Sequence, residues 1–258
     1  MKYFGAIDQG TTSSRFIVFD ESGSIIKQHQ QEFTQYFPDE VSVEHDPNEI
    51  WESVLNCIKE VDKEFLIDQL DSIGITNQRE TTLAWRKSTA EPLHKALVWQ
   101  DTRTQNICDE LKGLTELEES FNKTGLPIAT YFSLSKILWL LRNVDEVKQA
   151  REDNDLSFGT IDSWLLFKLT GEHVTDVTNA SRTLLMDLET LNWMKDILTT
   201  LNIPESSLPE IKPSLYNFGT NSELLKNVPL TSVLGDQQAA LFGQNCINSG
   251  DVKNTYGT

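Results

Sequence analysis

The sequence has 258 residues, of which 22 are Lys or Arg and 39 are Asp or Glu, so its formal net charge at pH 7 is −17. Hydrophobic residues make up 38% and charged residues 24%, a composition that excludes a disordered or collagen-like chain. Binding to a phosphate backbone requires a basic surface, so the acidity and the lack of a Lys/Arg-rich run argue against a nucleic-acid-binding protein.

The first third of the sequence begins with three predicted strands. They cover residues 3–7, 16–19 and 24–31 and are separated by polar turns at 9–14 and 20–23. Three strands joined by short turns indicate an antiparallel meander.

A helix and a fourth strand follow the meander. Asp46 suits the N-cap, Pro47 suits the first helical position, and Glu49 can close a capping box. Apolar residues then recur at helical spacing as far as residue 65, and residues 72–76 form a short apolar run. Because a strand after a helix usually lies parallel within the same sheet, this β-β-β-α-β pattern predicts a mixed sheet covered by helices.

The remaining sequence is expected to be more helical, without an internal repeat, linker or low-complexity tract. Helices are predicted at 101–112, 134–142, 160–169 and 191–201, a loop with short extended pieces at 203–230, a strand at 231–235 and a helix at 236–244.

The turn between the first two strands is rich in hydrogen-bond donors. Thr11, Thr12 and Ser13 can donate to phosphate oxygens, Asp8 can hold a magnesium ion through water, and Arg15 can order the turn or reach a phosphate. The alternative is a hydroxyl-rich turn that satisfies its own backbone. The sequence has no Walker A or GxGxxG pattern, so a phosphate site must be of this hairpin type.

Arg79 and Glu80 follow the predicted strand at 72–76. A guanidinium donates to hydroxyl oxygens and a carboxylate accepts hydroxyl protons, so the pair could recognise a polyol. Neighbours in a regular strand point to opposite faces, so both can reach one ligand only if the segment is irregular. The alternative is a solvated turn with a weak surface ion pair.

Three further residues each have a functional and a structural interpretation. Trp99 and Tyr131 could wall a pocket against the carbon side of a polyol, or could belong to the core. Asp236 could take a hydroxyl proton at the carboxyl end of a strand, where α/β sheets bind ligands, or could cap a helix.

The sequence contains no sign of export or of a zinc site. Cys57, Cys108 and Cys246 lie far apart and predict reduced thiols. The N-terminus reaches Asp8 before the apolar part of a signal peptide could form, and the longest apolar run, 137–141, is too short to span a bilayer. We therefore expect a cytoplasmic protein with no membrane span.

Several of these segments, taken in order, resemble the FGGY carbohydrate kinase family, and within it the members that phosphorylate glycerol. Any one of them could match by chance, but the ordered set is highly specific. The matching segments are 8–15 (DQGTTSSR), 44–47 (EHDP), 74–82 (GITNQRETT), 98–100 (VWQ), 179–183 (NASRT), 235–244 (GDQQAALFGQ) and 254–258 (NTYGT).

The resemblance implies an α/β fold with a ribonuclease-H-like (actin-like ATPase) mixed sheet and flanking helices. It also implies transfer of the γ-phosphoryl group of ATP to glycerol, with Mg²⁺ as cofactor, giving sn-glycerol 3-phosphate and ADP. Residues 1–258 would form the N-terminal domain, and a second lobe outside this sequence would supply most of the adenine pocket. The complete protein would be a homo-oligomer.

The resemblance further implies a role for each site residue. Arg79, Glu80, Tyr131 and Asp236 would hold glycerol, with Gln237 nearby, Trp99 walling the pocket and Asp236 as general base. Thr11, Thr12, Ser13 and Arg15 would contact the nucleotide phosphates, Thr258 would lie on the γ-phosphate side, and Asp8 would lie near magnesium.

Three other functions stay open on the residues alone. The first is another FGGY sugar or polyol kinase. The second is an actin-like or chaperone-like ATPase lobe, which would leave Arg79, Glu80 and Asp236 without a shared role, so a large separation of these residues would favour it. The third is a non-catalytic sensor of glycerol or nucleotide.

Overall fold

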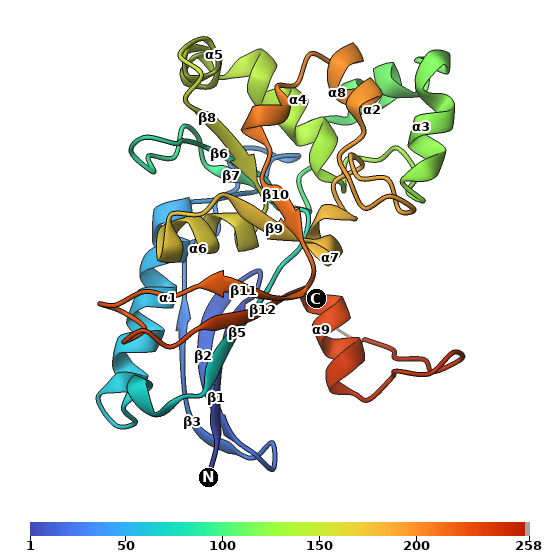
Figure 1. Cartoon of the computed structure of the whole chain (residues 1–258). Coiled ribbons are helices and arrows are strands. Elements are labelled where there is room, and N and C mark those ends of the chain that lie inside the picture. Colours follow the sequence, from blue (N-terminus) through green and yellow to red (C-terminus); the bar gives the residue numbers. More distant parts are fainter. Residues whose placement is uncertain (256–258) are drawn as a thin grey trace.

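A six-stranded mixed sheet forms the lower part of the molecule in the computed structural model, which describes residues 1–255 (Figure 1). The first three strands form the predicted antiparallel meander, and β5 and β12 both run parallel to β1. The order across the sheet is β11 (Leu215–Gly219), β12 (Leu230–Gly235), β5 (Ser72–Asn77), β1 (Tyr3–Gln9), β2 (Ser13–Asp20) and β3 (Ile25–Glu32).

The first hairpin has longer strands and a shorter turn than predicted. Gln9 still belongs to β1 and Ser13 already belongs to β2, so the predicted turn at 9–14 shrinks to residues 10–12. The polar side chains do not end the pairing because they alternate across the two faces. Gln9 and Ser14 are buried on one face, and the next pair along the ladder, Asp8 and Arg15, lies on the other.

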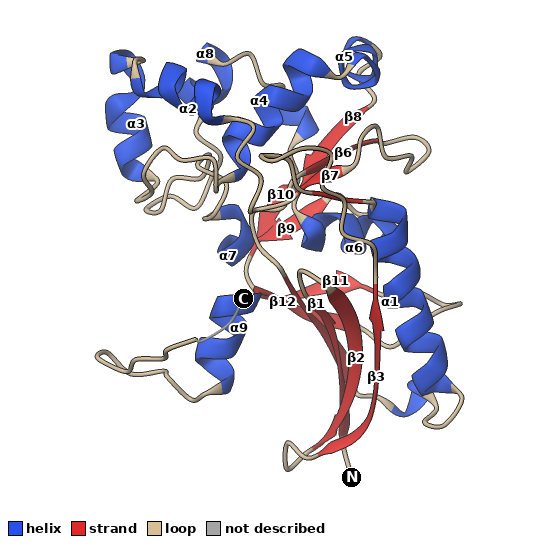
Figure 2. Cartoon of the chain, turned by 180° about the vertical axis from the view of Figure 1, so that it is seen from behind, coloured by secondary structure: helices blue, strands red, loops and turns tan. Residues whose placement is uncertain are grey.

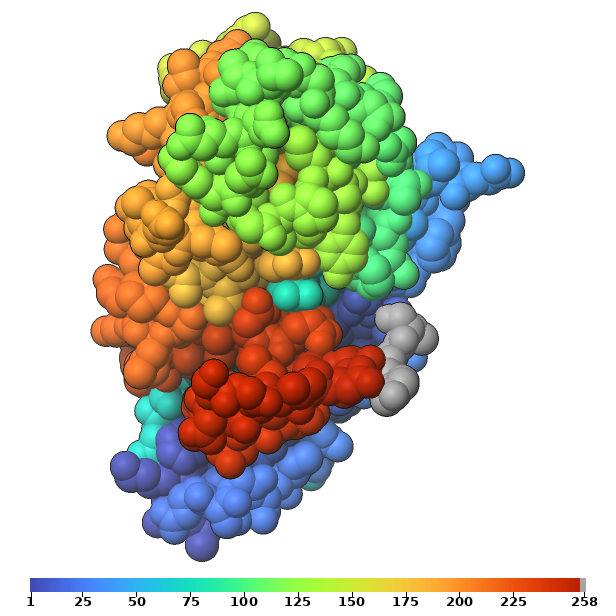
Figure 3. All heavy atoms as spheres, turned by 90° about the vertical axis from the view of Figure 1, so that its right-hand side faces the viewer, coloured from blue at the N-terminus to red at the C-terminus, as the bar shows by residue number. Residues whose placement is uncertain are grey.

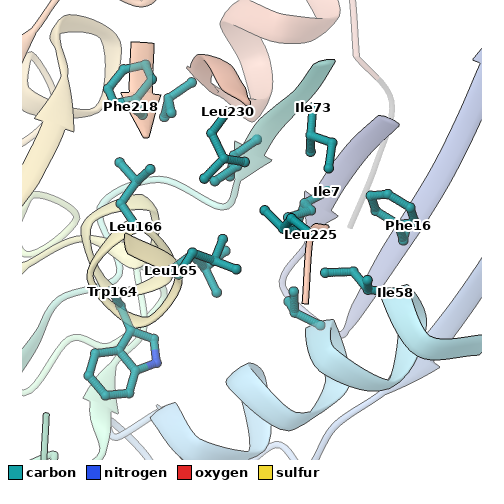
Figure 4. Packing of buried hydrophobic residues seen from close by; sticks show 14 of the residues in the cluster. Ile7, Phe16, Ile58, Ile73, Trp164, Leu165, Leu166, Phe218, Leu225 and Leu230 are labelled. Carbon is teal, nitrogen blue, oxygen red and sulfur yellow. The ribbon is translucent and has the colours of Figure 1, made fainter. Parts of the chain in front are cut away.

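Two helices, α1 (Pro47–Asp62) and α6 (Ile161–Thr170), cover one face of the sheet (Figure 2). Ile7 and Phe16 of the sheet, Ile58 of α1 and Trp164 of α6 are fully or almost fully buried (Figure 4). The apolar side chains that alternate along the strands thus pack against the apolar face of α1. This packing holds the sheet, and with it the upper edge, in place.

The start of α1 is partly as predicted. Asp46 is the N-cap and accepts a hydrogen bond from the backbone N–H of Asn48 at 2.9 Å, and the helix begins with a proline. The predicted capping box is wrong, because the Glu49 carboxylate accepts instead from the Thr34 backbone N–H at 3.0 Å and from the Tyr36 hydroxyl. Glu49 therefore ties α1 to the chain that follows β3.

The upper part of the molecule is mainly helical and has a second core, which includes Leu134, Leu140 and Phe158. Its helices are α2 (Gln105–Lys112), α3 (Glu118–Lys123), α4 (Ser133–Asn143), α5 (Asp145–Glu152), α7 (Val177–Ala180) and α8 (Lys195–Thr200), with short 3₁₀ turns at Thr115–Leu117 and Glu205–Ser207. A further 3₁₀ turn, Ile67–Gln69, joins α1 to β5 in the lower part. Its two-stranded sheets pair β4 (Glu44–His45) with β7 (Ala96–Leu97), β6 (Leu83–Arg86) with β8 (Leu156–Gly159), and β9 (Val174–Asp176) with β10 (Glu210–Lys212).

Several predicted boundaries in this part are wrong. The helix expected from residue 101 begins at Gln105, because the buried Asp101 carboxylate binds Arg103 and the Val43 backbone N–H in a turn. The helix predicted at 191–201 covers only Lys195–Thr200. The last helix, α9 (Asp236–Gly243), follows β12 directly, as predicted. Among residues 1–255, no helix has both the length and the apolar character needed to cross a membrane.

Candidate active site

A cleft of about 140 Å³ lies at the upper edge of the six-stranded sheet. Figure 3 shows the surface hollowed on this side, between the green and yellow upper part and the red C-terminal segment. Sites for drug-sized ligands measure roughly 300–1,000 Å³, so this cleft suits a smaller molecule. Its lining residues are Thr11, Arg79, Glu80, Trp99, Tyr131, Asp236 and Gln237.

The topology of the sheet explains why residues so far apart in sequence share the cleft. The strands β5 and β12 are parallel neighbours, so their carboxyl ends lie side by side. Arg79 and Glu80 follow the first strand, and Asp236 follows the second. This is the edge at which open α/β sheets bind ligands.

Glu80 has an unusual backbone that lets it share the cleft with its neighbour. Its φ angle is 61°, in the left-handed region that residues other than glycine seldom adopt. The side chains of Thr82 and Ser133 hold this conformation by donating hydrogen bonds to the Glu80 carbonyl oxygen, at 2.8 and 3.1 Å. The chain is therefore irregular here, which is the condition under which Arg79 and Glu80 can face one ligand.

Arg79 lies between the two carboxylates of the cleft. Its Nε is 3.1 Å from Asp236 Oδ1, its Nη2 is 3.9 Å from Glu80 Oε1, and its Nη1 donates to Gln238 Oε1 at 3.2 Å. The Nε atom is buried and has no well-aligned hydrogen bond within the described chain. The guanidinium is thus held between two acids, and because it lines the cleft it can donate to a ligand oxygen there.

Glu80 is the most enclosed charge in the cleft. Burial raises the pKa of this carboxyl group, while Arg79 and Arg182 oppose the increase. Arg182 Nε donates to Glu80 Oε1 at 2.6 Å. The carboxylate is thus held in a fixed position on one side and open to the cleft on the other.

Two aromatic rings also line the cleft. The ring centroids of Trp99 and Tyr131 are 5.5 Å apart, and burial raises the pKa of the Tyr131 hydroxyl. The Trp99 indole Nε1 donates to the Thr11 hydroxyl at 3.1 Å. This hydrogen bond links the aromatic wall to the hairpin between β1 and β2.

The hairpin contributes fewer groups to the cleft than its sequence suggests. Thr11 lines the cleft, whereas Thr12, Ser13 and Arg15 lie in the same hairpin outside the lining. The Ser13 hydroxyl accepts from Gln30 Nε2 at 2.9 Å. The remaining predicted phosphate contact, Thr258, lies outside the described residues.

Asp8 lies at the base of the hairpin and forms an ion pair with Arg15 at 2.8 Å. Burial raises the pKa of the Asp8 carboxyl, Arg15 opposes this, and the nearby charge of Asp236 adds to it. No group of three or more His, Cys, Asp or Glu side chains in residues 1–255 could hold a metal by itself. Any cation at Asp8 would need further ligands from a bound molecule or from water.

Comparison with known proteins identifies the family. Residues 3–243 match the family described as the FGGY family of carbohydrate kinases, N-terminal domain. The chain belongs to the FGGY family of carbohydrate kinases. The ribonuclease-H-like (actin-like ATPase) fold class predicted from the sequence is thereby confirmed.

Individual FGGY proteins are similar over the whole chain. A protein named glycerol kinase 2 from Streptomyces avermitilis is 52% identical over 100% of this chain and 52% of its own length. A glycerol kinase from Staphylococcus haemolyticus is 50% identical over 100% of this chain and 53% of its own length. A crystal structure of Plasmodium falciparum glycerol kinase with ADP superposes with a TM-score of 0.93 at 41% identity, over 100% of this chain and 53% of that one. The chain thus spans about half the length of these FGGY relatives.

Two residues that support this FGGY site were not predicted from the sequence. Gln78 donates from Nε2 to Gln9 Oε1 and to the Gly10 carbonyl oxygen, both at 3.1 Å, and so holds the turn of the hairpin. Lys136 is fully buried in α4 and donates to the carbonyl oxygens of Thr130 and Tyr131, the second at 3.3 Å. The partners of Gln78 lie 68 and 69 residues away in sequence, so no local pattern marks it. The partners of Lys136 are only five and six residues away, but no sequence pattern indicates that this lysine is buried.

Lys136 gives a prediction for stability. Burial lowers the pKa of Lys136 from 10.5 to about 8, so between these pH values the unfolded chain carries a proton that the folded chain has lost. The stability contribution of this group therefore rises as pH increases from about 8 towards 10.5. In the wild type, this group should raise the free energy of unfolding by up to about 1.4 kcal/mol per pH unit within this window. We expect Lys136→Met to lack this increase.

Urea denaturation at several pH values in this window measures the effect. Lys148→Met is the matched control, because Lys148 is a partly exposed lysine on α5 that pairs with Asp145. The control should follow the wild-type pH dependence. Identical slopes for Lys136→Met and wild type would contradict the prediction.

Proposed function

We propose that this chain is the N-terminal lobe of an ATP-dependent glycerol kinase that forms sn-glycerol 3-phosphate and ADP. The observation that carries the proposal is the shared cleft, in which Arg79, Glu80 and Asp236 meet beside Thr11 of the hairpin. Their convergence disfavours an actin-like or chaperone-like ATPase, in which these charged residues have no common task. The names of the relatives agree with the proposal.

Glycerol would be recognised by complementary polar and apolar groups. The Arg79 guanidinium would donate to one hydroxyl, and the Glu80 carboxylate would accept from another. The rings of Trp99 and Tyr131 would pack against the carbon atoms, and Gln237, which also lines the cleft, would lie nearby. A ligand of three carbons fits the small volume of the cleft.

Asp236 would act as general base. Its side chain is 42% exposed at the cleft, so it can meet an incoming hydroxyl group. The terminal hydroxyl oxygen forms a bond to the γ-phosphorus as the bond from that phosphorus to the β–γ bridging oxygen breaks. The hydroxyl proton passes to the Asp236 carboxylate, and ADP leaves with the electron pair of the broken bond.

The hairpin would hold the nucleotide phosphates through Thr11, Thr12, Ser13 and Arg15. Asp8 suits magnesium, because its partly buried carboxylate lies beside this turn and Mg²⁺ binds through one or two carboxylates together with phosphate oxygens and water. When bound, the ion would neutralise charge on the phosphates. Thr258 would lie on the γ-phosphate side.

The complete kinase would have a second lobe that packs against α9. No residue of α9 is buried, and Phe242 is 69% exposed, so the helix has an apolar surface without a partner among residues 1–255. The relatives are about twice as long as this chain, so we propose that the second lobe of the complete kinase covers this surface of α9. We further propose that the complete kinase is cytoplasmic and homo-oligomeric, as the family resemblance implies.

A substrate panel tests the proposal. ADP release by the complete protein is measured with ATP and, in parallel, glycerol, xylulose, ribulose or gluconate. We expect the highest kcat/KM with glycerol. A preference for one of the sugars would assign another FGGY activity, and ATP hydrolysis that ignores all four would favour an ATPase without an alcohol substrate.

A further inference from the structure

Arg182 makes the shortest contact that any cation makes with Glu80 in the described chain. Its Nε is 2.6 Å from Glu80 Oε1, whereas the sequence neighbour Arg79 approaches the same oxygen only to 3.9 Å. Glu80 and Arg182 are 102 residues apart in sequence. The arginine follows α7 and does not line the cleft, so it reaches the ligand site only through Glu80.

The flat face of the Arg182 guanidinium is also occupied. It lies over the ring of Phe132 at 4.9 Å and over the ring of Tyr131 at 5.9 Å from the centroid. One side chain thus contacts both the acidic and the aromatic wall of the cleft. Lysine cannot replace both contacts, because an ammonium group lacks the planar donor and the stacking face.

The backbone of Glu80 is fixed independently of Arg182. Thr82 and Ser133 hold its carbonyl oxygen, so the φ angle of 61° does not depend on the arginine. Arg182 therefore determines the direction of the side chain and leaves the path of the chain unchanged. Removing it should disturb recognition of the alcohol more than folding.

We propose that Arg182 is the positioning residue that aims the Glu80 carboxylate and the Tyr131 ring at the alcohol substrate. This inference rests on the proposed function. The charged and titratable groups that face Glu80 are Arg79, Arg182, Asp236, Tyr131 and Lys136. Loss of Arg182 leaves Glu80 with one fewer nearby cation, so its pKa should rise further and the acidic limb of activity should move to higher pH.

The test compares Arg182→Gln and Arg182→Lys with the wild-type complete kinase. The KM for glycerol should rise roughly 10–150-fold in Arg182→Gln, the size of effect expected when a hydrogen bond to a charged group is lost. The KM for ATP should stay within twofold. Arg182→Lys should recover part of the loss, because it keeps the charge without the planar fork.

Arg103→Gln is the matched control. Arg103 is also a largely buried arginine that pairs with carboxylates, Asp101 and Glu44, and lies over an aromatic ring, that of Trp139. It does not line the cleft. Its loss should lower the melting temperature while the KM for glycerol and the pH profile stay as in wild type.

The possible outcomes separate this inference from the proposed function. An unchanged KM for glycerol and an unchanged acidic limb in a folded Arg182→Gln enzyme overturn the role of Arg182. If that variant does not fold, Arg182→Lys decides: a raised KM supports the proposal and a wild-type KM overturns it. A wild-type enzyme that does not phosphorylate glycerol overturns the proposed function itself, and this inference with it.

Discussion

Replacing Asp236 by Asn in the complete kinase is expected to lower kcat by roughly 10²–10⁴-fold, the usual contribution of a general base. The amide keeps the size of the side chain and can still lie beside Arg79, 3.1 Å away in the native protein. It cannot accept a proton from the attacking hydroxyl group. The KM for glycerol should change much less than kcat, and steady-state kinetics with saturating ATP measure both.

A matched carboxylate tests whether the loss is specific. Asp153 is also 42% exposed and also lies 3.1 Å from an arginine, Arg86, but it does not line the cleft. Asp153→Asn should leave kcat within twofold of wild type. If Asp236→Asn retains kcat within the same range, Asp236 is not the base and the proton must leave by another route.

The lower part of the fold could be predicted because its signals are local. Alternating apolar residues, short turns and the Asp46–Pro47 helix start lie within the first third of the sequence, and the structure confirms the β-β-β-α-β unit built from them. Strand ends were less predictable. The pairing of Asp8 with Arg15 extends the hairpin through residues whose polarity indicated a turn.

The upper part gave weaker signals for a physical reason. Its strands, such as β6 (Leu83–Arg86), are short and pair only with one other short strand, so tertiary contacts decide whether they form. Glu49 illustrates the same limit. A capping box requires only contacts within one helix turn and can therefore be predicted from sequence. The Glu49 carboxylate instead accepts from Thr34 and Tyr36, which follow β3 and are brought to it by the fold.

The candidate site also contains residues that local motifs predict and residues that they do not. Residues in dense motifs, such as Arg79, Glu80 and Asp236, could be named from the sequence, and the fold brings them to one cleft. The partners that orient them could not. The bond from Arg182 to Glu80 joins residues that lie 102 positions apart in sequence, so no local pattern records it.

Residues 1–258 expressed without further sequence are expected to turn over ATP and glycerol at least roughly 10²-fold more slowly than the complete kinase, a loss typical of misplaced reactants. The cleft holds groups for the alcohol and one hairpin for phosphates, and the surface of α9 is open. Phosphoryl transfer depends on positioning and on exclusion of water, both of which require closure by a second lobe. Coupled measurement of ADP at equal protein concentrations gives the ratio.

A control must show that slow turnover comes from the missing second lobe and not from an unfolded chain. Circular dichroism should show that the isolated chain is folded, because both hydrophobic cores lie within it. Addition of the second lobe as a separate polypeptide should then restore part of the turnover. Replacing the exposed Phe242 on α9 by Asp should prevent this restoration, because it puts a charge on the surface where the lobes would meet. Turnover by the isolated chain at the rate of the complete kinase would mean that this cleft alone positions both substrates, and the proposed role of the second lobe would be wrong.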